Sequence, residues 1–237
     1  KNCAEWIIAD LAIWMAGHVS VPLYPTLTST SVRQILEHSG APVLFVGKLD
    51  VWDEAQAGVP ESVRCIAFSL APDDARSRFP LWQEIVSQHQ PLPDPANPSE
   101  DSLATIIYTS GTTGRPKGVM LSHNNIVSNV LDSAPRIPFK EGTSKALSFL
   151  PICHIFERVI LYIYQYYSVS VYFAESIDKL TVNHKEVHPN VMTVVPRLLE
   201  KVYDKIYAKG SELTGIKKKL FFWAIDLGLR YEPYGAN

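Results

Sequence analysis

The sequence has few cysteines, no strong excess of either charge and no long hydrophobic run. Its three cysteines among 237 residues, Cys3, Cys65 and Cys153, lie far apart in the chain. Their number and spacing suit neither a disulfide framework nor a cysteine-based metal site, so we expect reduced, buried or half-buried thiols in a cytoplasmic protein. Because 22 basic residues stand against 24 acidic ones and the net charge is −2, charge gives no reason to expect a nucleic-acid partner.

Hydrophobic segments are also short. The longest run free of acidic, basic and histidine residues covers residues 159–174 and is interrupted by Gln165, Ser168 and Ser170, whereas a membrane-spanning helix needs about 20 apolar residues. We therefore expect a soluble protein. The sequence leaves peripheral membrane contact and the oligomeric state open. Because Lys1 is not a start methionine, we do not treat it as the natural N-terminus.

Helix and strand patterns alternate along the first 90 residues. Asn2 and Glu5 have the spacing of a capping box for a helix that ends at Gly17. A helix capped by Ser29 or Thr30 follows, and apolar runs predict strands at 19–23, 42–46 and 63–69, with a short helix at 80–88. This order predicts an α/β fold with mostly parallel sheets flanked by helices.

A proline-rich segment divides this front part from the rest. Four prolines stand between Pro91 and Pro98, a density that no regular element tolerates. We expect a front α/β part over residues 1–90, a crossover over 91–100 and a second part of the same domain over 101–237.

The most informative stretch follows an apolar run at 103–107, which predicts a buried strand. We call it the phosphate loop (residues 108–118). It reads Tyr108-Thr109-Ser110-Gly111-Thr112-Thr113-Gly114-Arg115-Pro116-Lys117-Gly118. Glycines allow close approach of an anion to the backbone, and hydroxyls, amides and a lysine supply donors and charge. These are the properties of a polyphosphate site, although an ordinary turn between two strands would have a similar composition.

Two common phosphate motifs do not fit this loop. A Walker A motif that began at Gly111 would need glycine at Pro116, and the dinucleotide fingerprint needs Gly-x-Gly where the next glycine after Gly111 is Gly114. The loop therefore has to be interpreted as a motif of another kind.

A second stretch joins a predicted strand at 146–150 to a helix. It reads Leu150-Pro151-Ile152-Cys153-His154-Ile155-Phe156-Glu157-Arg158. A lone histidine there is usually structural, but the carboxyl end of a strand is also where open α/β sheets place ligands. We expect Arg158 to be ion-paired within its helix or at the surface. The apolar helix that follows is either core or the wall of a slot for an alkyl chain, and composition does not separate the two.

The remaining chain is less informative. Strands are predicted at 168–174 and 190–196, a helix from Pro196 and an amphipathic helix over 211–230. His123 is expected to have a structural role beside the phosphate loop. His184 and His188 lack a third ligand, so a zinc site is rejected.

Taken together, the two motifs resemble those of the adenylate-forming (AMP-binding) superfamily. The string Leu-Pro-x-x-His-x-Phe-Glu-Arg looks most like its long-chain fatty acyl-CoA synthetases. The resemblance implies the large N-terminal domain of that fold, with ATP, Mg²⁺, coenzyme A and a fatty acid as ligands. It makes Lys117 and His154 the catalytic candidates and Thr109 the hydroxyl nearest Mg²⁺. The implied phosphate-binding residues are Thr109, Ser110, Gly111, Thr112, Thr113, Gly114 and Lys117.

The sequence also departs from that family. It lacks the Tyr-Gly-x-Thr-Glu string, the ribose-binding aspartate and the catalytic lysine of the C-terminal domain, so we expect this piece to be inactive alone. Ser168 stands where relatives often have glycine, which leaves the width of the pocket open. The alternatives are a non-catalytic nucleotide- or acyl-binding module and another adenylating enzyme, such as an acyl-AMP ligase.

Overall fold

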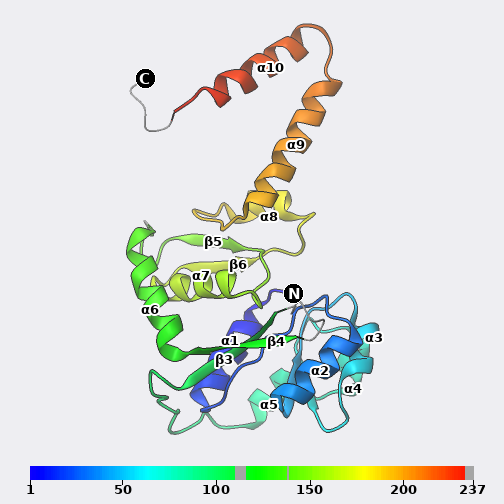
Figure 1. Ribbon diagram of the computed structural model, residues 1–237, viewed down its shortest axis with the longest axis vertical. Helices are drawn as coiled ribbons and strands as arrows, with labels where there is room; N and C mark the ends of the chain where they lie inside the picture. Colours follow the sequence, from blue (N-terminus) through cyan, green and yellow to red (C-terminus); the bar gives the residue numbers. More distant parts are fainter. Residues whose placement is uncertain (110–115, 138, 233–237) are drawn as a thin grey trace. The chain divides into compact units, whose positions relative to one another are not determined.

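The computed structural model describes residues 1–109, 116–137 and 139–232. The chain forms two compact units, Lys1–Thr193 and Val194–Asn237 (Figure 1). The predicted division at the proline-rich segment stays a prediction, although residues 91–98 contain neither helix nor strand.

The first unit is an α/β structure, as predicted. Its strands are β1 (Val43–Val46), β2 (Arg64–Ala67), β3 (Leu103–Thr109), β4 (Lys117–Ser122), β5 (Lys145–Ser148) and β6 (Ser170–Phe173). Its helices are α1 (Ala4–Met15), α2 (Ser29–Ser39), α3 (Trp52–Ala55), α4 (Asp73–Arg78), α5 (Trp82–Gln88), α6 (His123–Ser133), α7 (Ile155–Tyr166) and α8 (Leu180–Val187), with short 3₁₀ turns at Gln56–Gly58 and Ala134–Arg136.

The described strands form three pairs. β1–β2 and β5–β6 are parallel, as expected where helices connect the strands, whereas β3 and β4 form an antiparallel hairpin. The strands predicted at 19–23 and 190–196 are reduced to isolated bridges at Ser20 and Val191. In the first of these segments Pro22 has no N–H to donate, which limits a longer ladder.

Helix capping agrees with the sequence only in part. The sequence offers Ser122 or Asn124 as the cap of the helix after the phosphate loop, and the structure has Ser122 as the cap of α6, in a capping box with Asn125. By contrast, α2 is capped by Thr28 instead of Ser29 or Thr30. The capping box predicted at Asn2 and Glu5 is wrong, because α1 begins after Cys3 without a side-chain cap. Both side chains instead make contacts far along the chain, with residues 69 and 148–152.

The first unit contains several apolar clusters. One surrounds β1 and β2 and includes Trp52, while α7 contributes Tyr162 and Ile163 to a second cluster and Leu161 and Tyr164 to a third. The apolar helix that the sequence left ambiguous is therefore core over these four residues.

The second unit consists of α9 (Pro196–Glu212) and α10 (Gly215–Leu229). A Cβ atom at Gly210 of α9 would lie 1.9 Å from the Phe221 ring of α10, so glycine permits the close approach of these helices. The helix predicted over 211–230 is present, but it is not amphipathic in the expected way. Phe222 packs against Tyr207, whereas Leu220 and Trp223 are exposed.

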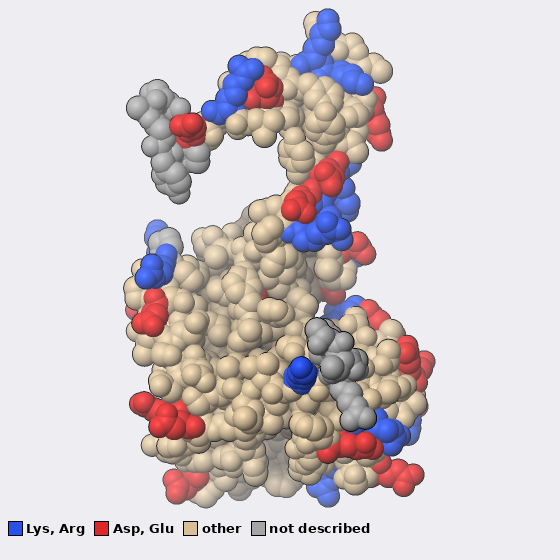
Figure 2. Space-filling view, in the orientation of Figure 1, with Lys and Arg blue, Asp and Glu red and all other residues tan. Residues whose placement is uncertain are grey.

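Within the described residues, every helix is too short or too polar to cross a bilayer. On the face shown in Figure 2, side chains of both charges are scattered among uncharged ones.

The end of α7 explains one departure from the family pattern. Ser168 has a φ of 52°, in the left-handed region. Val169 N–H donates to Tyr164 O and Ser168 N–H to Gln165 O, which together form the Schellman arrangement that usually contains glycine. Because Ser168 is exposed at this helix end, the left-handed backbone is by itself a sufficient reason to expect glycine at this position.

We therefore predict that Ser168→Gly increases the free energy of unfolding by about 0.5–1 kcal/mol, since a Cβ atom in the left-handed region is unfavourable. Urea denaturation measures the change. Ser87→Gly within α5 is the control and should lower stability, because glycine there costs conformational entropy without relieving strain. Equal destabilisation by both substitutions would contradict this account.

Candidate active site

The β3–β4 hairpin holds the two ends of the phosphate loop together. Thr109, the last residue of β3, is paired with Lys117, the first residue of β4, and both side chains are exposed. The predicted site residues Ser110, Gly111, Thr112, Thr113 and Gly114 lie outside the described residues. The structure thus brings together the two described members of the predicted phosphate site, Thr109 and Lys117.

Close packing fixes the start of β4. Gly118 is paired with Tyr108, and a Cβ atom at Gly118 would lie 2.7 Å from Ile106 Cγ2. The hydroxyl of Tyr108 is in turn 2.6 Å from His38 Nδ1 at the end of α2. His38 therefore lies at the end of its helix, and its contact anchors the end of β3 to α2.

His154 lies at the beginning of α7. It is the N-cap residue, and its Nδ1 accepts a hydrogen bond from Phe156 N–H at 3.2 Å. Since Nδ1 is the acceptor, Nε2 carries the proton in the neutral ring. The exposed imidazole can therefore present a donor to an anionic group.

The neighbouring thiol does not form a nucleophilic pair with this histidine. Cys153 is 3% exposed, and burial raises its pKa to about 11. The thiol is therefore protonated at neutral pH and is unreactive as a nucleophile.

Glu157 is buried one turn further along α7. Its Oε1 accepts a 2.5 Å hydrogen bond from Ser148 Oγ at the end of β5. Oε2 is buried and has no hydrogen-bond partner among the described residues. Burial raises the pKa of this carboxyl group to about 7, and the bond from Ser148 limits the rise.

Asn2 extends this contact to the turn before His154. Its Nδ2 donates to Ser148 Oγ at 3.2 Å and to Leu150 O at 2.7 Å, and its Oδ1 accepts from Ile152 N–H at 3.3 Å. The N-terminal segment thereby holds the turn that carries His154.

Arg158 corrects the prediction that it would be paired within its helix or at the surface. Its side chain is fully buried and forms an ion pair with Asp10 of α1, 2.5 Å from Nη2 to Oδ1. Nη1 donates to Thr105 Oγ1 of β3 at 2.8 Å, Nη2 to Ser20 Oγ at 2.6 Å and Nε to Tyr162 Oη at 2.7 Å. We call these five residues (Asp10, Ser20, Thr105, Arg158 and Tyr162) the Arg158 cluster.

The charges in this cluster are stabilised by their surroundings. Burial alone would lower the pKa of Arg158, but Tyr162 and Asp10 outweigh it and the pKa is raised. Burial also raises the pKa of Tyr162, so its hydroxyl remains protonated and donates to Asp10. The Trp6 and Trp14 rings lie 5.4 Å from the guanidinium carbon, a cation–π distance.

The expected structural role of His123 is consistent with its packing. Its ring lies 5.2 Å from that of Trp14, edge to face, and burial lowers its pKa. It is therefore part of the support for α1 and β4.

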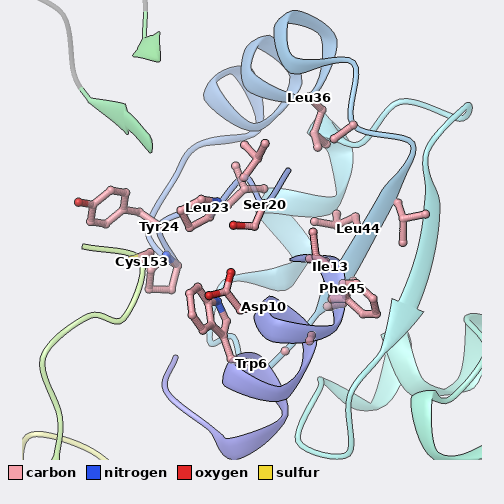
Figure 3. Close-up of a pocket in the computed structure, with 18 of the residues that line it drawn as sticks. Trp6, Asp10, Ile13, Ser20, Leu23, Tyr24, Leu36, Leu44, Phe45 and Cys153 are labelled. Atoms are coloured by element: carbon pink, nitrogen blue, oxygen red, sulfur yellow. The ribbon is translucent and has the colours of Figure 1, made fainter. Parts of the chain in front are cut away.

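A largely apolar cavity of about 790 Å³ lies beside the Arg158 cluster, and Asp10 and Ser20 are part of its lining. Figure 3 shows its lining from α1 (Trp6, Asp10, Ile13), the following segment (Ser20, Leu23, Tyr24), α2 (Leu36), β1 (Leu44, Phe45) and the turn at Cys153. Ser20 is bonded to β3 on one side, and β1 is paired with β2, so the cavity separates two strand edges. Its described lining includes neither Thr109, Lys117, His154 nor any residue of α7.

Sequence reasoning missed the Arg158 cluster. A signal was present: Asp10 lies among apolar residues in the second half of α1, and Arg158 directly precedes the apolar part of α7. Charges in such positions are seldom buried without a partner, but nothing in the sequence identified which partner each would take.

The buried Glu157 predicts a pH dependence of stability. Its folded pKa of about 7 exceeds the usual 4.5, so its contribution is complete below pH 4.5 and is lost as pH rises through 7. We predict a loss on the order of 3 kcal/mol between these limits. Chemical denaturation at pH 5 and pH 8 should show a smaller difference for Glu157→Gln than for the wild type. The same difference in both proteins would rule out this titration.

Known proteins resemble this chain in sequence and in fold. The family model described as AMP-binding enzyme matches residues 1–225. A long-chain-fatty-acid–CoA ligase of Xenopus laevis is 30% identical over 96% of this chain, and the peroxisomal long chain acyl-CoA synthetase 7 of Arabidopsis thaliana is 32% identical over 93%. The chain spans about a third of the length of these curated relatives, 33% in each case.

Solved structures show the same fold at lower sequence identity. Coronafacic acid ligase of Pectobacterium brasiliense matches 87% of this chain and 41% of its own, with a TM-score of 0.71 and 22% identity. O-succinylbenzoate coenzyme A synthetase of Bacillus subtilis, solved with ATP and magnesium ion, matches 92% of this chain and 41% of its own, with a TM-score of 0.64 and 21% identity. From the family match over nearly its whole length, the chain belongs to the AMP-binding enzyme family.

Proposed function

We propose that the protein activates a long-chain fatty acid at the expense of ATP and transfers it to coenzyme A. In the first step, the fatty-acid carboxylate attacks the α-phosphorus of ATP, and pyrophosphate leaves. In the second step, the coenzyme A thiol displaces AMP from the acyl-adenylate, and the thioester forms. This chain contains part of the machinery that these steps require.

The observation that most strongly supports the proposal is what the sequence relatives are named. Several relatives that are 30–32% identical over 93–96% of this chain are named long-chain-fatty-acid–CoA ligases or long chain acyl-CoA synthetases. The Leu150–Arg158 string supports the same group within the family.

The hairpin geometry fits a polyphosphate ligand. Thr109 and Lys117 are exposed and paired across the base of the loop, so a hydroxyl and an ammonium group are available on the same hairpin end. We assign Ser110, Gly111, Thr112, Thr113, Gly114 and Lys117 to the β- and γ-phosphates. Thr109 is the proposed Mg²⁺-proximal hydroxyl, and the metal would neutralise charge on the leaving pyrophosphate.

His154 is the proposed contact for the fatty-acid carboxylate. Its Nδ1 is occupied by the helix cap, which leaves Nε2 to orient an anionic oxygen. Hydrogen bonds of this kind lower the barrier when they are in place before charge moves.

Two other functions are distinguished from this one by their reactions. A non-catalytic nucleotide- or acyl-binding module would bind ATP without pyrophosphate exchange, and an acyl-AMP ligase would form the adenylate but not acyl-CoA.

The free, buried cysteines support a reducing compartment, and we propose the cytoplasm.

ATP–pyrophosphate exchange by the full-length natural protein tests the proposal. We expect exchange with long-chain fatty acids and acyl-CoA formation once coenzyme A is added. Exchange without acyl-CoA would support the acyl-AMP ligase, and ATP binding without exchange would support the module.

In the same protein, we predict that Lys117→Ala reduces the exchange rate by about 10²–10³, the usual loss for one charge-stabilising donor. Lys185→Ala on the exposed surface of α8 is the control and should leave the rate unchanged. Unchanged exchange in the Lys117 variant would remove this lysine from the site.

A further inference from the structure

Two adjacent residues at the start of α7 contact different parts of the first unit. Consecutive side chains on a helix diverge by about 100°, because 3.6 residues complete a turn. Glu157 accordingly reaches β5 through Ser148, while Arg158 reaches β3 through Thr105 and α1 through Asp10. The start of α7 is therefore fixed from two directions.

Both contacts act on the turn that carries His154. Arg158 N–H donates to the carbonyl oxygen of His154 at 3.2 Å, so the two residues occupy the same helical turn. On the other side, Asn2 connects the Ser148–Glu157 contact to Leu150 and Ile152.

Arg158 also contacts the strand that leads to the phosphate loop. Thr105 lies in β3, four residues before Thr109, and its hydroxyl donates to Ser20 O at 2.8 Å while accepting from Arg158. One guanidinium thus connects the strand that ends at the loop to the helix that follows His154.

Stability alone is a weak reason to have such a group. A buried ion pair is often no more stabilising than apolar side chains of the same volume, because both charges must be desolvated. Arginine, however, has donors in a rigid planar array, so its contacts specify direction as well as distance.

We propose that Glu157 and Arg158 are positioning residues that set His154 relative to β3 and its phosphate loop. The inference rests on the proposed function, in which the carboxylate near His154 attacks the α-phosphorus of a nucleotide held by the loop. A misplacement of about 1 Å between reacting groups can cost 10²-fold in rate. Their contribution is therefore to the alignment of the two halves of the site.

The kinetic test uses the full-length natural protein. Arg158→Lys keeps the charge but loses the planar array, and we expect the kcat of ATP–pyrophosphate exchange to fall about 10- to 100-fold, with the KM for ATP changed less than about threefold. Arg33→Lys is the control, since Arg33 is exposed and pairs only with Glu37 among charged side chains in the described residues. An unchanged kcat, or a loss confined to the KM for ATP, would overturn the proposal.

Glu157 provides an independent pair of variants. Glu157→Gln keeps an oxygen that can accept from Ser148 and should retain kcat within about threefold, whereas Glu157→Ala should show a loss similar to that of Arg158→Lys. Equal activity of the two variants would show that this contact does not position His154. If Arg158→Lys does not fold, Tyr162→Phe replaces it, because it removes one hydroxyl and leaves the ion pair.

Hydrogen exchange separates this proposal from the proposed function. If the wild-type protein shows no pyrophosphate exchange with any acid, the proposed function fails. The positioning claim then depends on amide exchange: Arg158→Lys should accelerate it about tenfold or more over residues 105–109 and 155–158, whereas Arg33→Lys should not. Unchanged exchange in both segments would overturn the positioning claim whatever the activity.

Discussion

The ion pair between Arg158 and Asp10 is the interaction on which the first unit depends. Its two residues are 148 positions apart in sequence, and both are almost completely buried. Around them, Thr105, Ser20 and Tyr162 also accept hydrogen bonds from the guanidinium. Removal of either charge would leave the other buried without a partner, which typically costs about 3–5 kcal/mol. The cluster therefore commits α1, β3 and α7 to one arrangement.

This arrangement of α1, β3 and α7 relates the two sequence motifs, the phosphate loop and the Leu150–Arg158 stretch, to each other in space. The phosphate loop is held at its ends by the β3–β4 ladder, and His154 is held by the cap of α7. Neither local structure determines where the other lies. The contacts of Arg158 with Thr105 and of Glu157 with Ser148 supply that relation, so a nucleotide and an acyl group could be held in a fixed relative orientation.

The sequence predicted what depends on local patterns. Gly17 follows the end of α1, Ser122 caps α6 and the α/β class follows from alternating apolar segments, all of which are properties of neighbouring residues. The capping box at Asn2 and Glu5 failed because both side chains have partners distant in sequence. The prediction for Arg158 was wrong for the same reason. Its charge suggested an ion pair within its helix or at the surface, whereas its partner Asp10 is distant in sequence and comes close only in the folded chain. The proposed roles of Lys117 and His154 came from motif resemblance, and the structure adds how each residue is held.

A double-mutant cycle tests the central claim most directly, with Asp10→Asn, Arg158→Met and both together, measured by chemical denaturation. If the two charges stabilise each other in the folded protein, the double variant should be less destabilised than the sum of the single variants by about 2 kcal/mol or more. Additive losses, with a coupling energy near zero, would contradict the claim that this ion pair holds α1 and α7 together.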